Sequence, residues 1–244
     1  MKLNCDMGES FGHWRMGMDE KVMPHVDMAN IACGFHASDP ATMMKTVALA
    51  KHYNVQVGAH PGYPDLVGFG RRHLSCSVTE IHAFILYQLG ALSAFCQQQK
   101  IALSYVKPHG ALYNDMMQHE EIFTAILSAV ADFQSGLPLM ILAQADNSQY
   151  QQLAAQLNVP LIFEAFADRC YTDTGQLQSR DQIGAVFHEQ AKIIAQAVQL
   201  VKTGMITTNT GKQVTLQADT ICVHGDNEQS IQAICQIRQA LRAQ

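Results

Sequence analysis

Short apolar runs alternate with longer amphipathic segments along most of the chain. Seven of these runs are rich in apolar and β-branched residues and predict buried strands. They cover residues 2–5, 27–33, 55–59, 102–106, 138–142, 160–163 and 220–223. Strands that alternate with helices are typical of a parallel sheet with its helices outside, so we expect an α/β fold.

Helical periodicity occupies most of the segments between these runs, at residues 41–52, 81–99, 120–132, 147–157, 183–201 and a last stretch that ends near residue 241. Side chains that accept hydrogen bonds from the first N–H groups of a helix precede four of these segments. They are Asp39 with Pro40 at the first helical position, the capping-box pairs Ser77/Glu80 and Ser179/Gln182, and Asp226. These signals predict where the connecting helices begin.

Two segments interrupt the alternation. Residues 8–23 are rich in Gly and Met and have room for only a short helix. Residues 205–216 hold two short extended runs around Asn209-Thr210-Gly211-Lys212, which predicts an inserted β-hairpin. Because Pro, Gly and Ser do not cluster into a linker, we expect residues 1–244 to form one domain. Seven parallel strands fit either a closed barrel or an open doubly wound sheet.

Composition narrows the class of protein. Apolar residues make up 48% of the 244 residues, which is enough for one sizeable core. The formal net charge of −5 gives no basic face for nucleic acid. No apolar run approaches the roughly 20 residues of a membrane span, and the first residues do not resemble a signal peptide. The seven cysteines include no Cys-x-x-Cys pair, which predicts free thiols in the cytoplasm.

Polar residues gather where the predicted strands end. In parallel α/β folds these carboxyl ends meet at one edge, where ligands bind. Four of the eleven histidines fall there, each with Gly or Pro nearby, namely His36, His60, His109 and His224. One such histidine is often a satisfied core residue, but four at equivalent positions are expected to converge on one site. The strand-end segments also supply Asn4, Asp6, Glu9, Asn30, Lys107, Glu164, Asp168, Arg169 and Asp226.

Several of these residues fit more than one role. Asp6 and Glu9 fit a metal site, a general base or a helix cap. Lys107 fits an anion contact or a structural ion pair with Asp6 or Glu164, because a buried Lys needs an anionic partner. Arg71, the first of two arginines after a Gly-rich loop, fits a carboxylate or phosphate site or a solvated surface pair.

Familiar catalytic motifs are absent from the sequence. It has no Gly-x-x-x-x-Gly-Lys-Ser/Thr loop, no Gly-x-Gly-x-x-Gly turn after a strand, no His-Glu-x-x-His helix and no Gly-x-Ser-x-Gly elbow. The candidate chemistry therefore depends on the strand-end residues alone.

Several long strings at these strand ends are shared with one family. They cover residues 4–12 (NCDMGESFG), 29–36 (ANIACGFH), 58–65 (GAHPGYPD), 68–72 (GFGRR), 106–114 (VKPHGALYN), 164–169 (EAFADR) and 223–226 (VHGD). In this order they resemble the lactam-utilization protein family, whose members are described as the A subunit of 5-oxoprolinase (ATP-hydrolysing). The resemblance spans the whole chain. Ser38 departs from it, because the family pattern has Gly at that position.

The resemblance implies a distorted seven-stranded parallel β/α barrel, TIM-like and of the glycoside hydrolase/deacetylase superfamily type. It also implies the ATP-coupled opening of 5-oxo-L-proline (pyroglutamate) to L-glutamate, together with two partner subunits, B and C. A chain without a Walker loop fits a multi-subunit enzyme. We expect ATP with Mg²⁺, or another divalent metal, as the cofactor set, and neither nucleic acid nor membrane as a partner.

A lactam is a stabilised amide, so phosphorylation of its oxygen would make the ring carbon electrophilic. For this chemistry the expected catalytic residues are Asp6, Glu9, His36, His60, Lys107, His109 and Asp168. The expected substrate and phosphate contacts are Asn4, Asn30, Arg71, Glu164, Arg169, His224 and Asp226. Cationic side chains among them would hold anionic groups, while a carboxylate or histidine would act as general base.

Two alternatives stay open at this point. Asp6, His60 and His109 fit an Asp-His-His metal site, and hence a metal-dependent deacetylase or amidohydrolase. A bound transition metal, activity lost to chelators and no need for ATP would favour that class. The other alternative is a non-catalytic subunit whose barrel mouth holds substrate for a partner.

Overall fold

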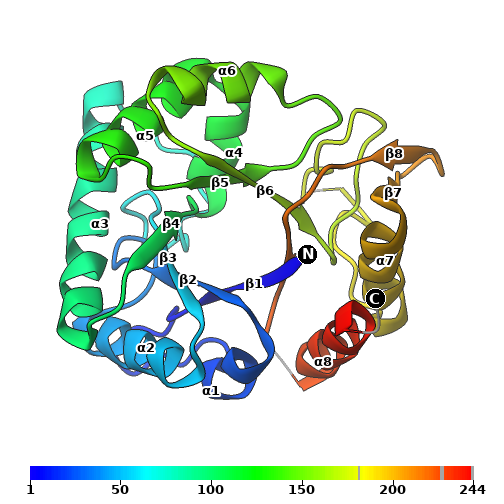
Figure 1. Cartoon of the computed structure of the whole chain (residues 1–244), viewed down its shortest axis with the longest axis horizontal. Coiled ribbons are helices and arrows are strands. Elements are labelled where there is room, and N and C mark those ends of the chain that lie inside the picture. The colour runs from blue at the N-terminus through cyan, green and yellow to red at the C-terminus, as the bar shows by residue number, and fades with distance from the viewer. Residues whose placement is uncertain (181, 226–227, 243–244) are drawn as a thin grey trace.

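Seven parallel strands close into a barrel in the computed structural model, which describes residues 1–180, 182–225 and 228–242. The strands are β1 (Lys2–Met7), β2 (Met28–Ala32), β3 (Gln56–His60), β4 (Leu103–Val106), β5 (Leu139–Leu142), β6 (Leu161–Phe166) and β9 (Thr220–Val223). Because β9 pairs with both β6 and β1, the sheet closes on itself. The predicted β/α barrel is confirmed, and the open-sheet alternative is wrong (Figure 1).

Helices surround this barrel on its outer face (Figure 1). They are α1 (Asp19–Val22), the 3₁₀ helix η1 (Met23–His25), α2 (Pro40–Tyr53), α3 (Val78–Gln99), α4 (Gly110–Gln118), α5 (Glu120–Phe133), α6 (Ser148–Gln156), α7 (Gln190–Thr203) and α8 (Glu228–Arg242). An antiparallel hairpin of β7 (Met205–Thr207) and β8 (Gln213–Thr215) lies between α7 and β9, within the segment expected to form one.

Two helix starts follow from the capping signals in the sequence. The Asp39 side chain accepts hydrogen bonds from the backbone N–H groups of Ala41 and Thr42 at the start of α2. Ser77 and Glu80 form the reciprocal capping box at the start of α3. The predicted cap Asp226 lies outside the described residues.

The expected helix over residues 183–201 is wrong in its first half, because α7 begins only at Gln190. The Ser179/Gln182 pair therefore does not stand at the start of a helix in the part of the chain that the structure describes. Residues 169–180 and 182–187 fold back on themselves instead, with a backbone bridge between Arg169 and Val186. The Phe187 N–H group also donates to the carbonyl oxygen after β6, at residue 168. Backbone groups bonded in this way are not available to a helix.

The helix α4 was not predicted. It begins at Gly110, directly after the fourth strand-end string, and its apolar residues Ala111, Leu112 and Met116 are buried. Their spacing matches one helical face, but the Gly and Pro of the same string favour a tight turn. The helix start places His109 at its N-cap position, next to the barrel mouth.

α3 is long and apolar enough, by length and composition, to cross a membrane. In this structure its apolar face is turned inward, with Ile81, Ile85, Leu89 and Leu92 buried. It packs against α2 and α5. This pattern is that of a helix that covers the barrel core.

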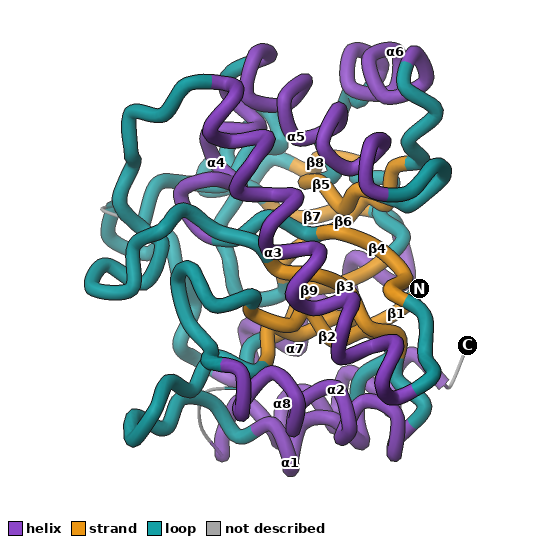
Figure 2. Tube along the Cα trace, turned by 90° about the vertical axis from the view of Figure 1, so that its left-hand side faces the viewer, coloured by secondary structure: helices purple, strands orange, loops and turns teal. Residues whose placement is uncertain are grey.

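The barrel interior is filled in layers by alternate residues of the strands. Nearest the amino ends, Met28, Tyr105, Met140 and Ile162 form an apolar cluster that is separate from the main core. Gly58 leaves room there for the Tyr105 ring. Between this apolar cluster and the carboxyl ends of the strands, polar side chains fill the barrel. Figure 2 shows the N-terminus at one end of the barrel and the long loops that follow the strands at the other end.

Candidate functional site

A cavity of about 430 Å³ opens at the carboxyl ends of the strands. Asp6 reaches it from β1, and His60 reaches it from β3. Residues two apart on a strand point to the same side, and Asp6, His60 and Phe166, at or next to the ends of β1, β3 and β6, point to this mouth. Glu9, Arg71, Lys107, His109, Arg169, Arg180 and His224 also line the cavity. Most of the residues expected at the site are therefore brought together.

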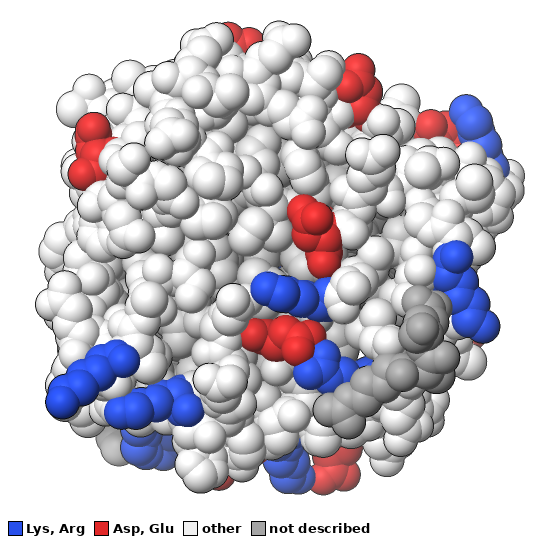
Figure 3. Space-filling model, viewed as in Figure 1, with Lys and Arg blue, Asp and Glu red and all other residues white. Residues whose placement is uncertain are grey.

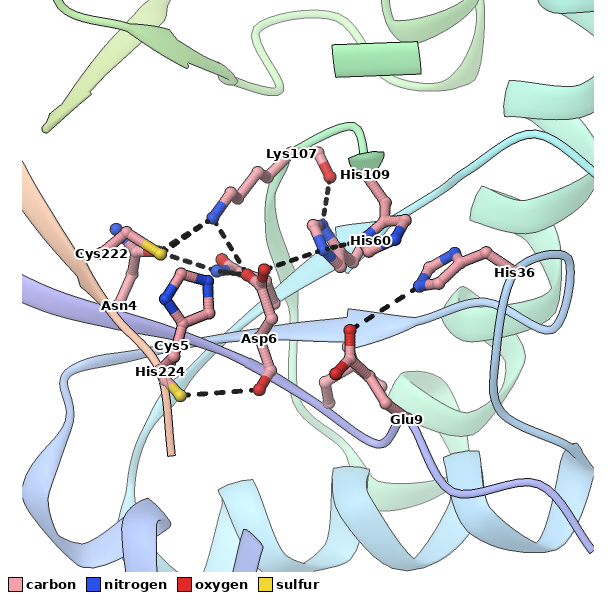
Figure 4. A network of polar contacts seen from close by, with 12 residues as sticks. Asn4, Cys5, Asp6, Glu9, His36, His60, Lys107, His109, Cys222 and His224 are labelled. Atoms are coloured by element: carbon pink, nitrogen blue, oxygen red, sulfur yellow. Dashed lines mark hydrogen bonds and ion pairs between the residues drawn. The ribbon is translucent and has the colours of Figure 1, made fainter. Parts of the chain in front are cut away.

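Lys107 stands at the base of the cavity between two carboxylates, and Figure 4 shows its ammonium group next to Asp6. Its Nζ lies 2.9 Å from Oδ1 of Asp6 and 3.1 Å from Oε2 of Glu164. Burial lowers the pKa of this amine, but the charges of Asp6, Cys222 and Glu164 outweigh burial and raise the pKa well above its usual value. The structural ion pair considered from the sequence is therefore present, and it includes both carboxylates.

Three residues expected to contact substrate lie below the cavity instead. Asn4, Asn30 and Glu164 are fully buried and do not line it. Nδ2 of Asn30 donates to Oδ1 of Asp6 at 2.7 Å and to Oδ1 of Asn4 at 2.8 Å. Asn4 in turn donates to Oε2 of Glu164 at 3.3 Å. These residues position Asp6 and Lys107. Their expected role as substrate contacts is therefore corrected: they hold the residues of the cavity floor in place.

Asp6 connects the ammonium group to a group of histidines. Its Oδ2 atom lies 3.3 Å from Nε2 of His60. Burial raises the pKa of Asp6, but the charges of His60 and Lys107 lower it well below the usual value, so the carboxyl group is ionised. A negative charge is thereby fixed at the centre of the cavity floor.

The three histidines His36, His60 and His109 lie against one another. Nε2 of His60 is 3.0 Å from Nδ1 of His109, and the rings of His36 and His109 stack with their centroids 3.7 Å apart. Burial and the neighbouring His60 lower the pKa of His109 to about 3. Burial and both other histidines lower the pKa of His36 well below its usual value. Both rings are therefore neutral at physiological pH.

His224 and Asp168 form a second acid–base pair at the mouth. Nδ1 of His224 lies 2.7 Å from Oδ2 of Asp168. Burial raises the pKa of Asp168, but the charge and hydrogen bond of His224 outweigh it, so the pKa is lowered. An ionised carboxylate that fixes an imidazole in this way is the arrangement that general bases use. The sequence suggests the reverse assignment, with Asp168 as the base and His224 as a substrate contact.

Arginines form the cationic wall of the cavity. Arg169 is buried, and its guanidinium donates to the carbonyl oxygens of Ala185 and Gln178, which holds the folded-back segment in place. Arg71 lies over the Phe69 ring, 5.1 Å from its centroid. Arg71 and Arg180 both line this cavity and a neighbouring one of about 420 Å³. Two exposed arginines at a shared opening suit an anionic ligand.

Two residues of the site were not predicted. Arg180 belongs to the segment where the sequence predicts a helix start, and nothing in the local pattern points to the cavity. Sγ of Cys222 accepts a hydrogen bond from Nζ of Lys107 at 3.3 Å. Cys222 lies in β9, two residues before His224, which follows the strand end, so its inward direction follows from strand periodicity. Asp226 lies outside the described residues.

Comparison with known proteins gives a consistent result. The model of the LamB/YcsF family matches residues 1–244. The chain is 59% identical over 239 residues to the 5-oxoprolinase A subunit of Vibrio vulnificus (strain YJ016), and the match covers 98% of this chain and 96% of that protein. It is 54% identical over 239 residues to the 5-oxoprolinase A subunit 2 of Pseudomonas putida, covering 98% and 93% of the two chains.

Solved structures agree with this. The lactam utilization protein from Thermus thermophilus superposes with a TM-score of 0.92 and 40% identity, covering 100% of this chain and 96% of that one. A putative cellobiose-phosphate cleavage protein from Enterococcus faecalis V583 superposes with a TM-score of 0.58 at 11% identity, covering 99% and 93%. The second likeness concerns the fold alone.

Proposed function

This chain belongs to the LamB/YcsF family, and from that premise we propose that it is the A subunit of an ATP-dependent 5-oxoprolinase. The enzyme would open 5-oxo-L-proline to L-glutamate with hydrolysis of ATP. The observation that carries the proposal is the identity of up to 59%, over nearly the full length of both chains, to proteins named as 5-oxoprolinase A subunits. The cavity of about 430 Å³ falls within the roughly 300–1,000 Å³ typical of small-molecule sites.

The proposed reaction consumes one ATP and two waters for each lactam. Transfer of the terminal phosphoryl group of ATP to the amide oxygen makes the ring carbon electrophilic. One water adds to that carbon and the ring C–N bond breaks, which gives the amine and an acyl phosphate. A second water releases phosphate, so the products are glutamate, ADP and phosphate.

Two side chains are suited to the water-dependent step. Asp168 holds Nδ1 of His224, which leaves Nε2 as the nitrogen that would take a proton from the attacking water. This proposal moves the role of base from Asp168 to His224. Asp168 would orient the imidazole and stabilise its protonated form.

Anionic groups of the reactants would lie against the cationic wall. The substrate carboxylate and the transferred phosphoryl group both suit Arg71 and Arg180, which are at the opening. Lys107 is already balanced by two carboxylates, so we assign it to fixing Asp6 and the floor of the cavity. ATP would bring Mg²⁺ with it, since phosphoryl transfer needs its charge stabilised by a metal.

Partner subunits B and C are part of the proposal. The sequence has no glycine-rich phosphate loop of the Walker type, so we assign the missing ATP contacts to the assembled enzyme. The cytoplasm is the compartment we propose, because all seven cysteines are free thiols.

A substitution of the proposed base tests this assignment. In a complete mixture with subunits B and C, ATP, Mg²⁺ and 5-oxoproline, we expect His224→Gln to lower glutamate formation by about 10²- to 10⁴-fold, the usual effect of losing a general base. The melting temperature should change little, because the glutamine amide can still donate a hydrogen bond to Asp168.

The matched control is His82→Gln, which removes an imidazole that also pairs with an aspartate, Asp132, but lies on the outer face of α3. This variant should turn over like the wild type. Wild-type turnover by His224→Gln would exclude His224 as the base.

A further inference from the structure

His60 and His109 face each other, and a carbonyl oxygen holds the far side of each ring. Nδ1 of His60 is 2.7 Å from the carbonyl oxygen of Lys107, and Nε2 of His109 is 2.9 Å from that of Phe69. A carbonyl oxygen only accepts, so each of these two nitrogens carries a hydrogen. The other two nitrogens are 3.0 Å apart, and Nε2 of His60 also lies 3.3 Å from Oδ2 of Asp6.

His36 adds a third imidazole without a hydrogen-bond partner. It is 1% exposed, and neither ring nitrogen has a partner among the described residues. A Cβ at Gly62 would lie 2.7 Å from its Nδ1, so that nitrogen faces the backbone. Nε2 points toward Glu9, 3.9 Å from Oε1 (Figure 4). A buried polar group without a partner costs about 1–3 kcal/mol in general, so this arrangement calls for a ligand.

One ligand atom from each of Glu9, His36, His60 and His109 lies within 4.8 Å of every other. We propose that these four residues bind one divalent transition-metal ion, for which Zn²⁺ is the best match. Three imidazoles with one carboxylate form a donor set that suits Zn²⁺ and similar ions, whereas Mg²⁺ prefers oxygen ligands. This inference goes beyond the proposed function and does not depend on it.

The distances suit such an ion. Imidazole nitrogens lie about 2.0–2.1 Å from Zn²⁺, so two of them at angles of about 90–110° are about 2.8–3.4 Å apart. The nitrogens of His60 and His109 are 3.0 Å apart. Metal-bound histidines also donate their other ring N–H to a carbonyl or carboxylate, as both rings do here.

The other candidate group at the mouth is less suitable for a cation. Asp6, Cys222 and His224 also offer three ligand atoms within 4.8 Å of one another. Nζ of Lys107 lies 2.9 Å from Asp6 and 3.3 Å from Cys222, so an ammonium group already supplies the positive charge there. A second cation would be repelled. Glu9 and His36 therefore replace Asp6 in the metal site anticipated from the sequence.

An ion at this position would border the cavity, because Glu9, His60 and His109 line it. It could polarise a carbonyl or phosphoryl oxygen of a bound reactant, or lower the pKa of a bound water toward about 7. The ligand that we assign to this metal ion is therefore an oxygen atom, either of the substrate or of a water molecule.

Metal binding is measured on the whole chain, freed of metal with a chelator and without partner subunits. After addition of Zn²⁺ and desalting, elemental analysis should give one Zn²⁺ per chain, and the melting temperature should rise because the ion binds only the folded state. Co²⁺ in its place should give visible d–d absorption without a thiolate charge-transfer band, since no cysteine is a ligand.

Variants connect the binding to the proposed residues. His36→Phe keeps the stacked ring but removes its nitrogens, and Glu9→Gln removes the charge at a partly exposed position. Each should weaken Zn²⁺ binding by at least the roughly 10- to 100-fold typical of a lost outer partner of a ligand. The control is His52→Phe, an exposed imidazole that also contacts an aromatic ring, that of Tyr53.

Four results would overturn the proposal. They are no bound Zn²⁺ in the folded wild type, a thiolate band with Co²⁺, unchanged affinity in both site variants, and equal loss in His52→Phe. Because no turnover is measured, the result does not depend on whether the chain is part of a 5-oxoprolinase.

Discussion

At the scale of single residues, the packing of the barrel interior depends on a glycine, Gly58, which has no side chain. Gly58 faces the ring of Tyr105, and a Cβ built there would overlap Cε2 of that ring. The Tyr105 hydroxyl donates to Oδ1 of Asn30 at 2.6 Å, and Asn30 holds Asp6. A glycine in the strand therefore determines where the carboxylate at the cavity floor is placed.

Gly58→Ala is expected to reduce the free energy of unfolding by about 3 kcal/mol, the upper end of what overpacking costs, because a rigid ring and its hydrogen bond must move. Denaturant unfolding measures the change. The control is Gly90→Ala in α3, where a Cβ meets nothing within 4 Å and should stabilise by up to about 1 kcal/mol. A change below about 0.5 kcal/mol at Gly58 would contradict this packing account.

The sequence predicted which side chains gather at the mouth, but not which of them touch a ligand. Histidines beside Gly or Pro at strand ends marked His60 and His109 correctly as cavity residues. Asn30 and Glu164 belong to the same strings, yet they lie one layer deeper. Depth along the axis depends on the stagger between neighbouring strands, and one strand's sequence does not contain that information.

At the scale of elements, an ion pair joins the last helix to the amino end of the barrel. Arg238 of α8 donates from both Nη atoms to the two carboxylate oxygens of Asp27, at 2.5 and 2.6 Å. Oδ2 of Asp27 also accepts from the backbone N–H of Leu3 in β1 at 2.9 Å. This carboxylate therefore connects α8, β1 and the residue before β2.

Asp27→Asn is expected to cost about 1–2 kcal/mol of unfolding free energy at pH 7, because the paired geometry is bidentate and partly buried. Burial raises the pKa of Asp27, but hydrogen bonds from Arg238 and Leu3 outweigh it and lower the pKa. A lowered folded-state pKa stabilises fully above the unfolded value of about 3.9, and the contribution is lost as pH falls through the folded value. The difference between variant and wild type should therefore shrink below about pH 4.

Urea unfolding at pH 7 and pH 3 measures this difference. Asp132→Asn is the control, because it removes an exposed carboxylate paired with His82 and should change stability by less than about 0.5 kcal/mol at pH 7. If Asp27→Asn lowered the free energy of unfolding equally at both pH values, ionisation of Asp27 would contribute nothing to stability.

The elements themselves were predictable where one period dominates. The seven strands and most helices follow from apolar runs and caps. The fold-back of residues 169–180 and 182–187 was not predictable, because its structure comes from backbone hydrogen bonds to residues just after β6 rather than from local propensity. Arg180, which lines the cavity, lies in this segment and was therefore not predicted, whereas Arg169 was predicted from the string that ends the sixth strand.

At the scale of the whole molecule, the surface gives no broad field of one sign on the face that carries the N-terminus. Figure 3 shows acidic and basic side chains intermixed near the centre of that face, with large uncharged areas around them. This agrees with a net charge of −5 spread over 244 residues. At the opposite end Arg71 and Arg180 line the cavity, which suits the small anion of the proposed function.

The proposed chemistry depends on more than this barrel. Its mouth supplies an oriented imidazole, a fixed carboxylate and two arginines, while the sequence lacks a Walker loop for ATP. We therefore expect assembly to complete the active site.

An omission series tests this central claim most directly. This chain, subunits B and C, ATP with Mg²⁺ and 5-oxoproline are combined in full and with each component left out in turn, and glutamate and phosphate are measured. The account predicts equal amounts of both products in the complete mixture and neither above background when any component is missing. Glutamate formed by this chain alone without ATP, or no glutamate from the complete mixture, would contradict it.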